Sequence, residues 1–163
     1  MTGEASQDRD NGLERAAGEM RELLDSARRR IWLQTRSQLL CALPPIDIAE
    51  ALSRVARRSR YADLRLLIDD ALALKEGQPQ LARAVMRLTT AVEVRCFQPE
   101  EDTPASLLLI VDQHAWLYLV QHQGHVGLKS MHDDPPGARI AADRFDESWI
   151  FGTEALELRN LMI

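Results

Sequence analysis

The most constraining feature of this 163-residue sequence is the uninterrupted apolar run Leu107-Leu-Leu-Ile-Val111. A strand with one face in water alternates apolar and polar residues, and this run does not alternate. Continuous apolar runs are typical of strands buried on both faces of a sheet, which other elements must then cover. The run therefore predicts a strand inside a layered α/β domain.

Strand and helix patterns alternate through the rest of the chain. Short runs rich in apolar and β-branched residues predict strands at 30–35, 63–68, 92–97, 116–121 and 125–131. Apolar stripes with helical spacing predict helices at 13–27, at 48–58 with Asp47 as its cap, from Pro79, and after Pro135-Pro136. This order favours a mixed β-sheet flanked by helices, with the early strands parallel and the later ones antiparallel.

Composition favours one folded domain. Hydrophobic residues make up 45% of the chain, so we expect residues 12–163 to form a single α/β domain with its own core. Residues 1–11 are polar and show no period, which predicts a mobile tail. No apolar run approaches the about 18 residues of a membrane span. Without a secretory pattern, and with only two cysteines, a cytoplasmic protein is expected.

Three segments of the chain, spanning about residues 28 to 152, resemble one half of a phospholipase D-like domain. The first is the early βαβα pattern with strands at 31–34 and 64–68. The second is the loop and strand that end at Ile110-Val-Asp112, and the third is a closing helix with Phe145 and Trp149 in a Phe-x3-Trp pattern. The chain is also similar to small bacterial proteins of this class. The resemblance implies a phospholipase D-like half.

The same resemblance implies a scaffold without its usual activity. If Asp112 is the acid of the family's His-x-Lys-x4-Asp signature, Ala105 stands at the position of the His and Leu107 at that of the Lys. Neither side chain can attack phosphorus or neutralise a phosphate. We therefore expect a non-catalytic accessory or binding domain, whose partner is a small anionic ligand, another protein or a second copy in a homodimer.

An enzyme with relocated chemistry is the main alternative. Acidic residues follow several predicted strands, and in α/β sheets ligands lie outside the carboxyl ends of strands. This predicts a candidate pocket formed by Asp69, Glu100, Asp102, Asp112 and His114. A desolvated carboxylate there could serve as an acid or a base.

A metal site is a second possibility. If Gln123-Gly124 forms a two-residue hairpin turn, His122 and His125 lie directly opposite each other, with Cβ atoms about 5 Å apart. Two imidazoles at that separation could share a zinc ion, with Asp133 as a third ligand.

Arginines offer a third site. Residues 28–65 hold nine arginines and three acids, in a chain whose net charge is −5. Arg54, Arg57 and Arg58 are predicted to share one helix face that could bind an anion, and the run Arg28-Arg29-Arg30 introduces the first strand. The negative net charge of the chain and the absence of a recognised nucleic-acid-binding module argue against nucleic acid as the partner. The sequence also holds no Walker loop or Gly-x-Ser-x-Gly, and no cofactor is predicted.

Overall fold

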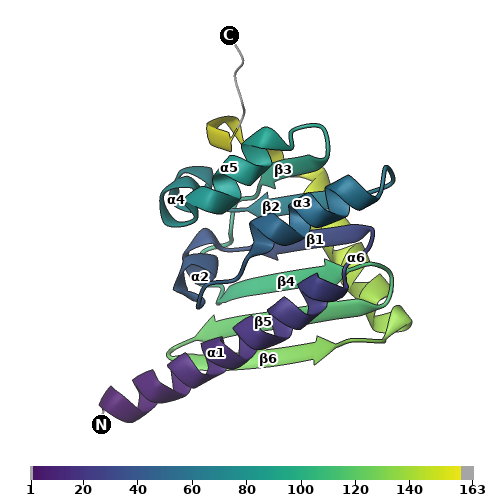
Figure 1. Ribbon diagram of the computed structural model, residues 1–163. Helices are drawn as coiled ribbons and strands as arrows, with labels where there is room; N and C mark the ends of the chain where they lie inside the picture. Colours follow the sequence, from purple (N-terminus) through teal and green to yellow (C-terminus); the bar gives the residue numbers. More distant parts are fainter. Residues whose placement is uncertain (1, 159–163) are drawn as a thin grey trace.

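A computed structural model describes residues 2–158, which form a seven-stranded sheet with helices on both faces (Figure 1). The strand order is β6-β5-β4-β1-β2-β3-β7. The strands are β1 (Arg30–Thr35), β2 (Asp63–Ile68), β3 (Val92–Cys96), β4 (Ala105–Val111), β5 (Ala115–His122), β6 (His125–Met131) and β7 (Thr153–Glu154). Strands β1, β2 and β3 are parallel, whereas β4, β5 and β6 continue from β1 as an antiparallel meander. The predicted mixed α/β sheet is confirmed.

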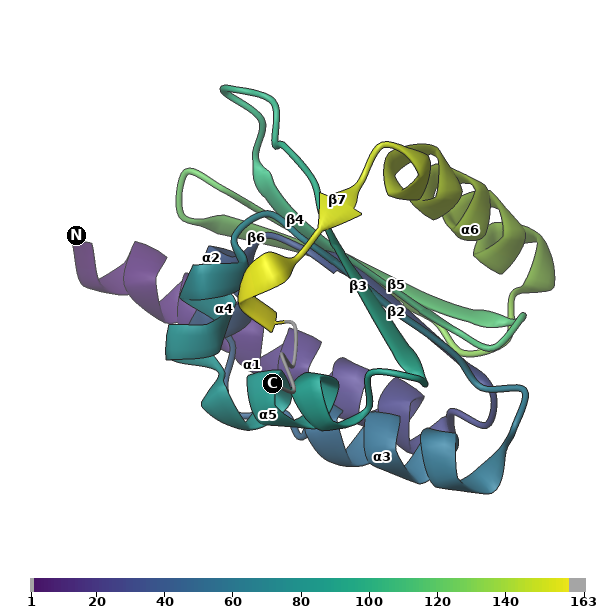
Figure 2. The same ribbon diagram turned by 90° about the horizontal axis from the view of Figure 1, so that it is seen from above.

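The helices are divided unequally between the two faces of the sheet. Helices α1 to α5 lie on one face, and α6 crosses the other face alone (Figure 2). The helices are α1 (Thr2–Ser26), α2 (Ser37–Ala42), α3 (Ile48–Arg58), α4 (Ala71–Gly77), α5 (Pro79–Arg87) and α6 (Pro135–Ile150), and a 3-10 turn follows at Leu156–Leu158. None of the helices within residues 2–158 is long and apolar enough to cross a membrane.

Two apolar clusters fill the space between sheet and helices. Leu109 belongs to the larger cluster under α1 to α5, and its neighbour Ile110 belongs to the smaller cluster under α6. Successive residues of a strand point to opposite faces, so the apolar run of β4 serves both clusters, as its composition predicts. The smaller cluster consists of Trp32, Leu67, Ile110, Ala141, Phe145 and Trp149.

Local turn chemistry follows the sequence closely. Gln123 and Gly124 both have positive φ angles, 51° and 79°, as a two-residue hairpin of the primed type requires. The carboxylate of Asp47 accepts a hydrogen bond of 2.9 Å from the backbone N–H of Glu50 and so caps α3 as predicted.

The N-terminal helix is longer than its apolar stripe. Residues 2–11, predicted as a tail, form the first turns of α1 and extend beyond the sheet (Figure 1). This stretch contains no proline, and its polar side chains suit a solvated helix. Contact with the sheet starts at Gly12, where a Cβ atom would come within 2.8 Å of Val126 Cβ.

Candidate functional site

Asp112, in the turn between β4 and β5, has a structural role because its side chain holds the turn between α1 and β1. Its backbone has a φ of 53°, a left-handed conformation that Asp adopts more readily than most residues. Its carboxylate accepts backbone N–H bonds from Arg29 at 2.8 Å, from Arg30 at 3.0 Å and from Arg28 at 3.2 Å. Asp112 therefore orients a backbone segment that begins β1.

The groups needed for the phospholipase D reaction do not surround Asp112. Leu107 is fully buried in β4, five residues before Asp112, and Lys75 and Lys129 lie in α4 and β6. His114 lines the same pocket as Asp112, but its Nδ1 lies 3.1 Å from the carbonyl oxygen of His132. Within residues 2–158, no lysine converges on this acid with a histidine.

The predicted carboxylate pocket is not formed, because its members lie at opposite ends of the sheet. Strand β4 runs antiparallel to β1 and β2, so Asp112 at its end lies beside the start of β2 while Asp69 follows the end of β2. Six residues of strand separate these ends by about 20 Å. Asp69 is also engaged, accepting a 2.6 Å bond from Ser37 N and pairing with Arg36 at 3.3 Å.

The other two acids of that pocket lie with Asp69 and away from Asp112. Glu100 and Asp102 are exposed in the loop between β3 and β4, where Asp102 adopts a φ of 66°. His114 stays with Asp112 at the opposite end. The prediction that these side chains share one cleft is wrong.

The histidine hairpin is formed as predicted, but its third ligand is elsewhere. His122 and His125 are paired in register and exposed. Asp133 follows the far end of β6 and cannot join them. The group of three metal-ligating side chains that the described residues bring together is a different one: Glu19, Glu22 and His132. Hydrogen bonds from His132, and then from Ser130, lower the pKa of Glu19 below its usual range.

The predicted arginine face on α3 is divided. Arg54 donates a 2.5 Å hydrogen bond to the carbonyl oxygen of Leu24 and so ties α3 to the end of α1. Arg57 pairs with Glu50 at 3.7 Å. Of these three arginines, only Arg58 is exposed without an ion pair or hydrogen bond to another described residue.

Four exposed arginines lie on the segments that lead into the parallel strands β1 and β2, and we call them the arginine edge: Arg28 and Arg29 before β1, and Arg58 and Arg60 at and after the end of α3. The guanidinium of Arg60 lies 5.0 Å from the centre of the Tyr61 ring and that of Arg29 lies 5.6 Å from it. Arg29 Nε donates to the Tyr61 carbonyl oxygen at 3.3 Å, and Arg60 Nη2 to the Tyr61 hydroxyl at 2.9 Å. Tyr61 is 60% exposed, and a pocket of about 390 Å³ beside it is lined by Arg28 and Arg29.

Other arginines on the sheet have structural roles. Arg30 lies 4.1 Å from the centre of the Trp32 ring and pairs with Asp63 at 3.7 Å. Arg65 lies over the same ring at 4.4 Å and pairs with Asp146 at 3.4 Å. These two guanidinium groups belong to the packing under α6.

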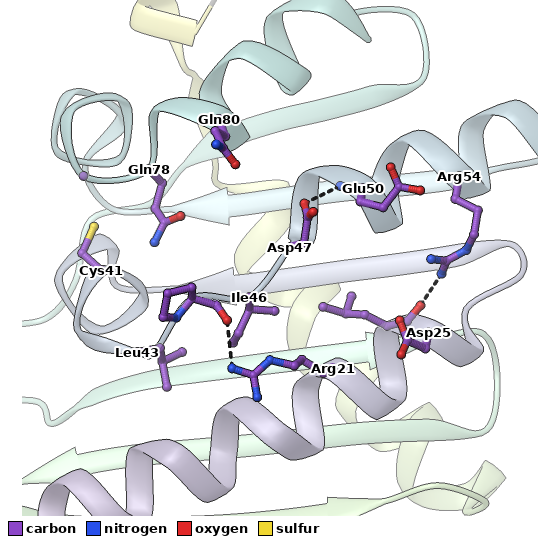
Figure 3. A pocket seen from close by; sticks show the side chains of 13 residues that line it. Arg21, Asp25, Cys41, Leu43, Ile46, Asp47, Glu50, Arg54, Gln78 and Gln80 are labelled. Carbon is purple, nitrogen blue, oxygen red and sulfur yellow. Dashed lines mark hydrogen bonds between the residues drawn. The ribbon is translucent and has the colours of Figure 1, made fainter.

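The largest pocket, of about 680 Å³, lies between α1, α3 and the segment that joins α2 to α3 (Figure 3). Three of its charged side chains bond to the protein backbone. Arg21 donates to the Pro45 carbonyl at 2.9 Å, and Arg54 and Asp47 bond to backbone groups of α1 and α3. Of the contacts drawn in Figure 3, that of Arg54 ties α3 to α1, that of Arg21 ties α1 to the segment before α3, and that of Asp47 caps α3.

The two cysteines carry no activated thiol. Partial burial raises the pKa of Cys41, which lines the large pocket. Burial, and then the carboxylate of Glu157, raises the pKa of Cys96. A reactive cysteine has a lowered pKa, so neither thiol shows the shift that activation requires.

Comparison with known proteins extends the fold assignment and identifies the family. No curated protein matches the sequence. The fold resembles that of TrmBL2, an archaeal chromatin protein whose structure shows a novel mode of DNA binding, with a TM-score of 0.65 at 12% identity. The match covers 88% of this chain and 51% of that one, so this chain spans about half the length of its structural relative. Residues 12–161 match the family described as a domain of unknown function (DUF7931), and the chain belongs to that family.

Proposed function

We propose that this chain is a non-catalytic binding domain that holds phosphate-bearing anions at its arginine edge. We also propose that its scaffold is a phospholipase D-like half that has lost the catalytic His and Lys. The second proposal rests on the sequence of strand 105–112 and on the hydrogen bonds of Asp112.

The observation that carries the proposal is the unequal pairing of the arginines. Arg30, Arg36, Arg57, Arg65 and Arg95 each have a carboxylate partner. The four arginines of the edge have none among the residues described, and all four are exposed. Guanidinium groups form two parallel hydrogen bonds with a phosphate, so unpaired arginines on two neighbouring segments, two of them lining a pocket beside Tyr61, suit a phosphate-bearing ligand.

A nucleic acid is a specific form of this ligand. The exposed ring of Tyr61 offers a surface on which a base can stack between the arginines. The structural relative that binds DNA supports this choice. The net charge of −5 opposes it, because the rest of the surface repels a polyanion.

Fluorescence anisotropy with a labelled single-stranded oligonucleotide tests the proposal. Exposed ion pairs are worth up to about 1 kcal/mol each, so the double substitution R28A/R60A should weaken binding by about tenfold. The matched control is R139A/R144A, which removes the same charge from exposed positions on α6.

Two outcomes decide between ligands, and a third overturns the proposal. Competition by inorganic pyrophosphate at low concentration favours a small phosphate ligand, whereas resistance to pyrophosphate favours nucleic acid. Equal weakening in the two double variants, or no binding of either probe by the wild-type chain, would show that the arginine edge is not a binding site.

A further inference from the structure

Two glutamates of α1 meet a histidine beyond β6 on the surface of the protein. Glu19 and Glu22 are three positions apart on α1, so their side chains lie on the same side of the helix. His132 follows the last residue of β6, the strand that α1 crosses (Figure 1). The helix and the strand thus bring together residues that are 113 positions apart in the sequence.

The ligand atoms of these three residues have the spacing of a metal site. His132 Nε2 lies 3.1 Å from Glu19 Oε2 and 3.6 Å from Glu22 Oε2, and all three atoms lie within 4.8 Å of one another. Zinc bonds to nitrogen and oxygen at about 2.0–2.2 Å, which places the corners of its tetrahedron about 3.3–3.6 Å apart. Small adjustments of exposed side chains would therefore bring the three atoms onto one ion.

The surroundings orient two of the ligands. Ser130 Oγ donates a 3.0 Å hydrogen bond to Glu19 Oε2, and Glu19 is only partly exposed. His114 Nδ1 contacts the carbonyl oxygen of His132 at 3.1 Å and so restrains the backbone of that ligand. Outer contacts of this kind fix the direction of metal ligands. Glu22, with 68% of its side chain exposed, leaves one side of the group open to water.

We propose that Glu19, Glu22 and His132 bind one divalent transition-metal ion of the zinc class, with water as the remaining ligand, and that the ion fastens α1 to the end of β6. An imidazole and two carboxylates are donors that zinc accepts, and three protein ligands with one open position are a common zinc arrangement. The His122 and His125 pair supplies only two ligands, so the three-residue group is the stronger candidate within residues 2–158.

Isothermal titration calorimetry of the full chain with zinc chloride, in a buffer that does not chelate zinc, tests the site. The wild-type chain should bind one ion. Loss of an outer contact alone costs about 10–100-fold in affinity, so H132A, E19Q and E22Q should each weaken zinc binding by about tenfold or more. The matched control is H122A/H125A, which removes two exposed imidazoles and should bind zinc as the wild type does.

Thermal unfolding followed by circular dichroism supplies a second readout. Zinc should raise the midpoint of the wild type and of H122A/H125A by the same amount and raise that of E22Q by less, because an ion that binds only the folded state stabilises it more when it binds more tightly. Glu22 is exposed, so E22Q should fold even if H132A does not. An absence of saturable binding in the wild type, or binding that survives E22Q and disappears in H122A/H125A, would overturn the proposal.

Discussion

Replacing Asp112 tests whether this acid is a structural residue or a remnant of catalysis. Its carboxylate accepts three backbone N–H groups, and its backbone occupies the left-handed region. A hydrogen bond to a charged group contributes about 1.5–3 kcal/mol. Arg28 and Arg29 are exposed, so water replaces part of what is lost, and the three bonds together should be worth about 2–3 kcal/mol.

Three substitutions separate the two contributions. Asp112→Ala removes the acceptors and adds the cost of a left-handed alanine, about 1 kcal/mol, for a total of about 3–4 kcal/mol. Asp112→Gly removes the acceptors alone, so it should be less destabilising than Asp112→Ala by about 1 kcal/mol. Asp112→Asn keeps one acceptor oxygen and tolerates the left-handed conformation, so it should cost only about 1 kcal/mol.

Urea denaturation followed by circular dichroism measures these free energies of unfolding. Hydrolysis of bis-p-nitrophenyl phosphate by the same samples measures phosphodiesterase activity. A structural role for Asp112 is refuted if the free energy of unfolding of Asp112→Ala lies within about 0.5 kcal/mol of the wild-type value. The structural role is also refuted if the wild type hydrolyses the diester and Asp112→Asn abolishes this hydrolysis without changing the free energy of unfolding.

Two further substitutions test the packing. Phe145 is fully buried and stacks on Trp32 and Trp149, with ring centres 4.9 and 5.5 Å away. Phe145→Ala should therefore lower the free energy of unfolding by about 3–5 kcal/mol. A loss below about 1 kcal/mol would show that α6 contributes little to the core. Asp47→Ala removes the cap of α3 and should cost about 1 kcal/mol, whereas Asp133→Ala, at an exposed residue, should leave stability unchanged. If urea denaturation shows that Asp47→Ala and Asp133→Ala change the free energy of unfolding equally, the capping role of Asp47 is contradicted.

The fold was largely predictable because the periodicity of the sequence is strong. The apolar run of β4 and the stripes of α3 and α5 identify their elements without help from distant residues. Helices α2 and α4 were missed because segments of six and seven residues are too short to show a stripe.

The candidate sites were less predictable, because each depends on relations between distant elements. The antiparallel direction of β4 sends Asp112 and Asp69 to opposite ends of the sheet, and no local pattern shows this. Glu19 and His132 meet only because α1 crosses β6. The excess of arginines in residues 28–65 was visible, but the structure was needed to show that Arg54 and Arg57 are engaged while Arg58 is not.

The salt dependence of oligonucleotide binding tests the arginine edge most directly. If all four arginines neutralise phosphates of a single strand, the slope of log K against log salt is about −2.8, which is a loss of about 50-fold between 50 and 200 mM salt. R28A/R60A should halve that slope, to a loss of about sevenfold, while R139A/R144A keeps the wild-type slope. A slope that R28A/R60A leaves unchanged, or an affinity that does not vary with salt, would contradict the account.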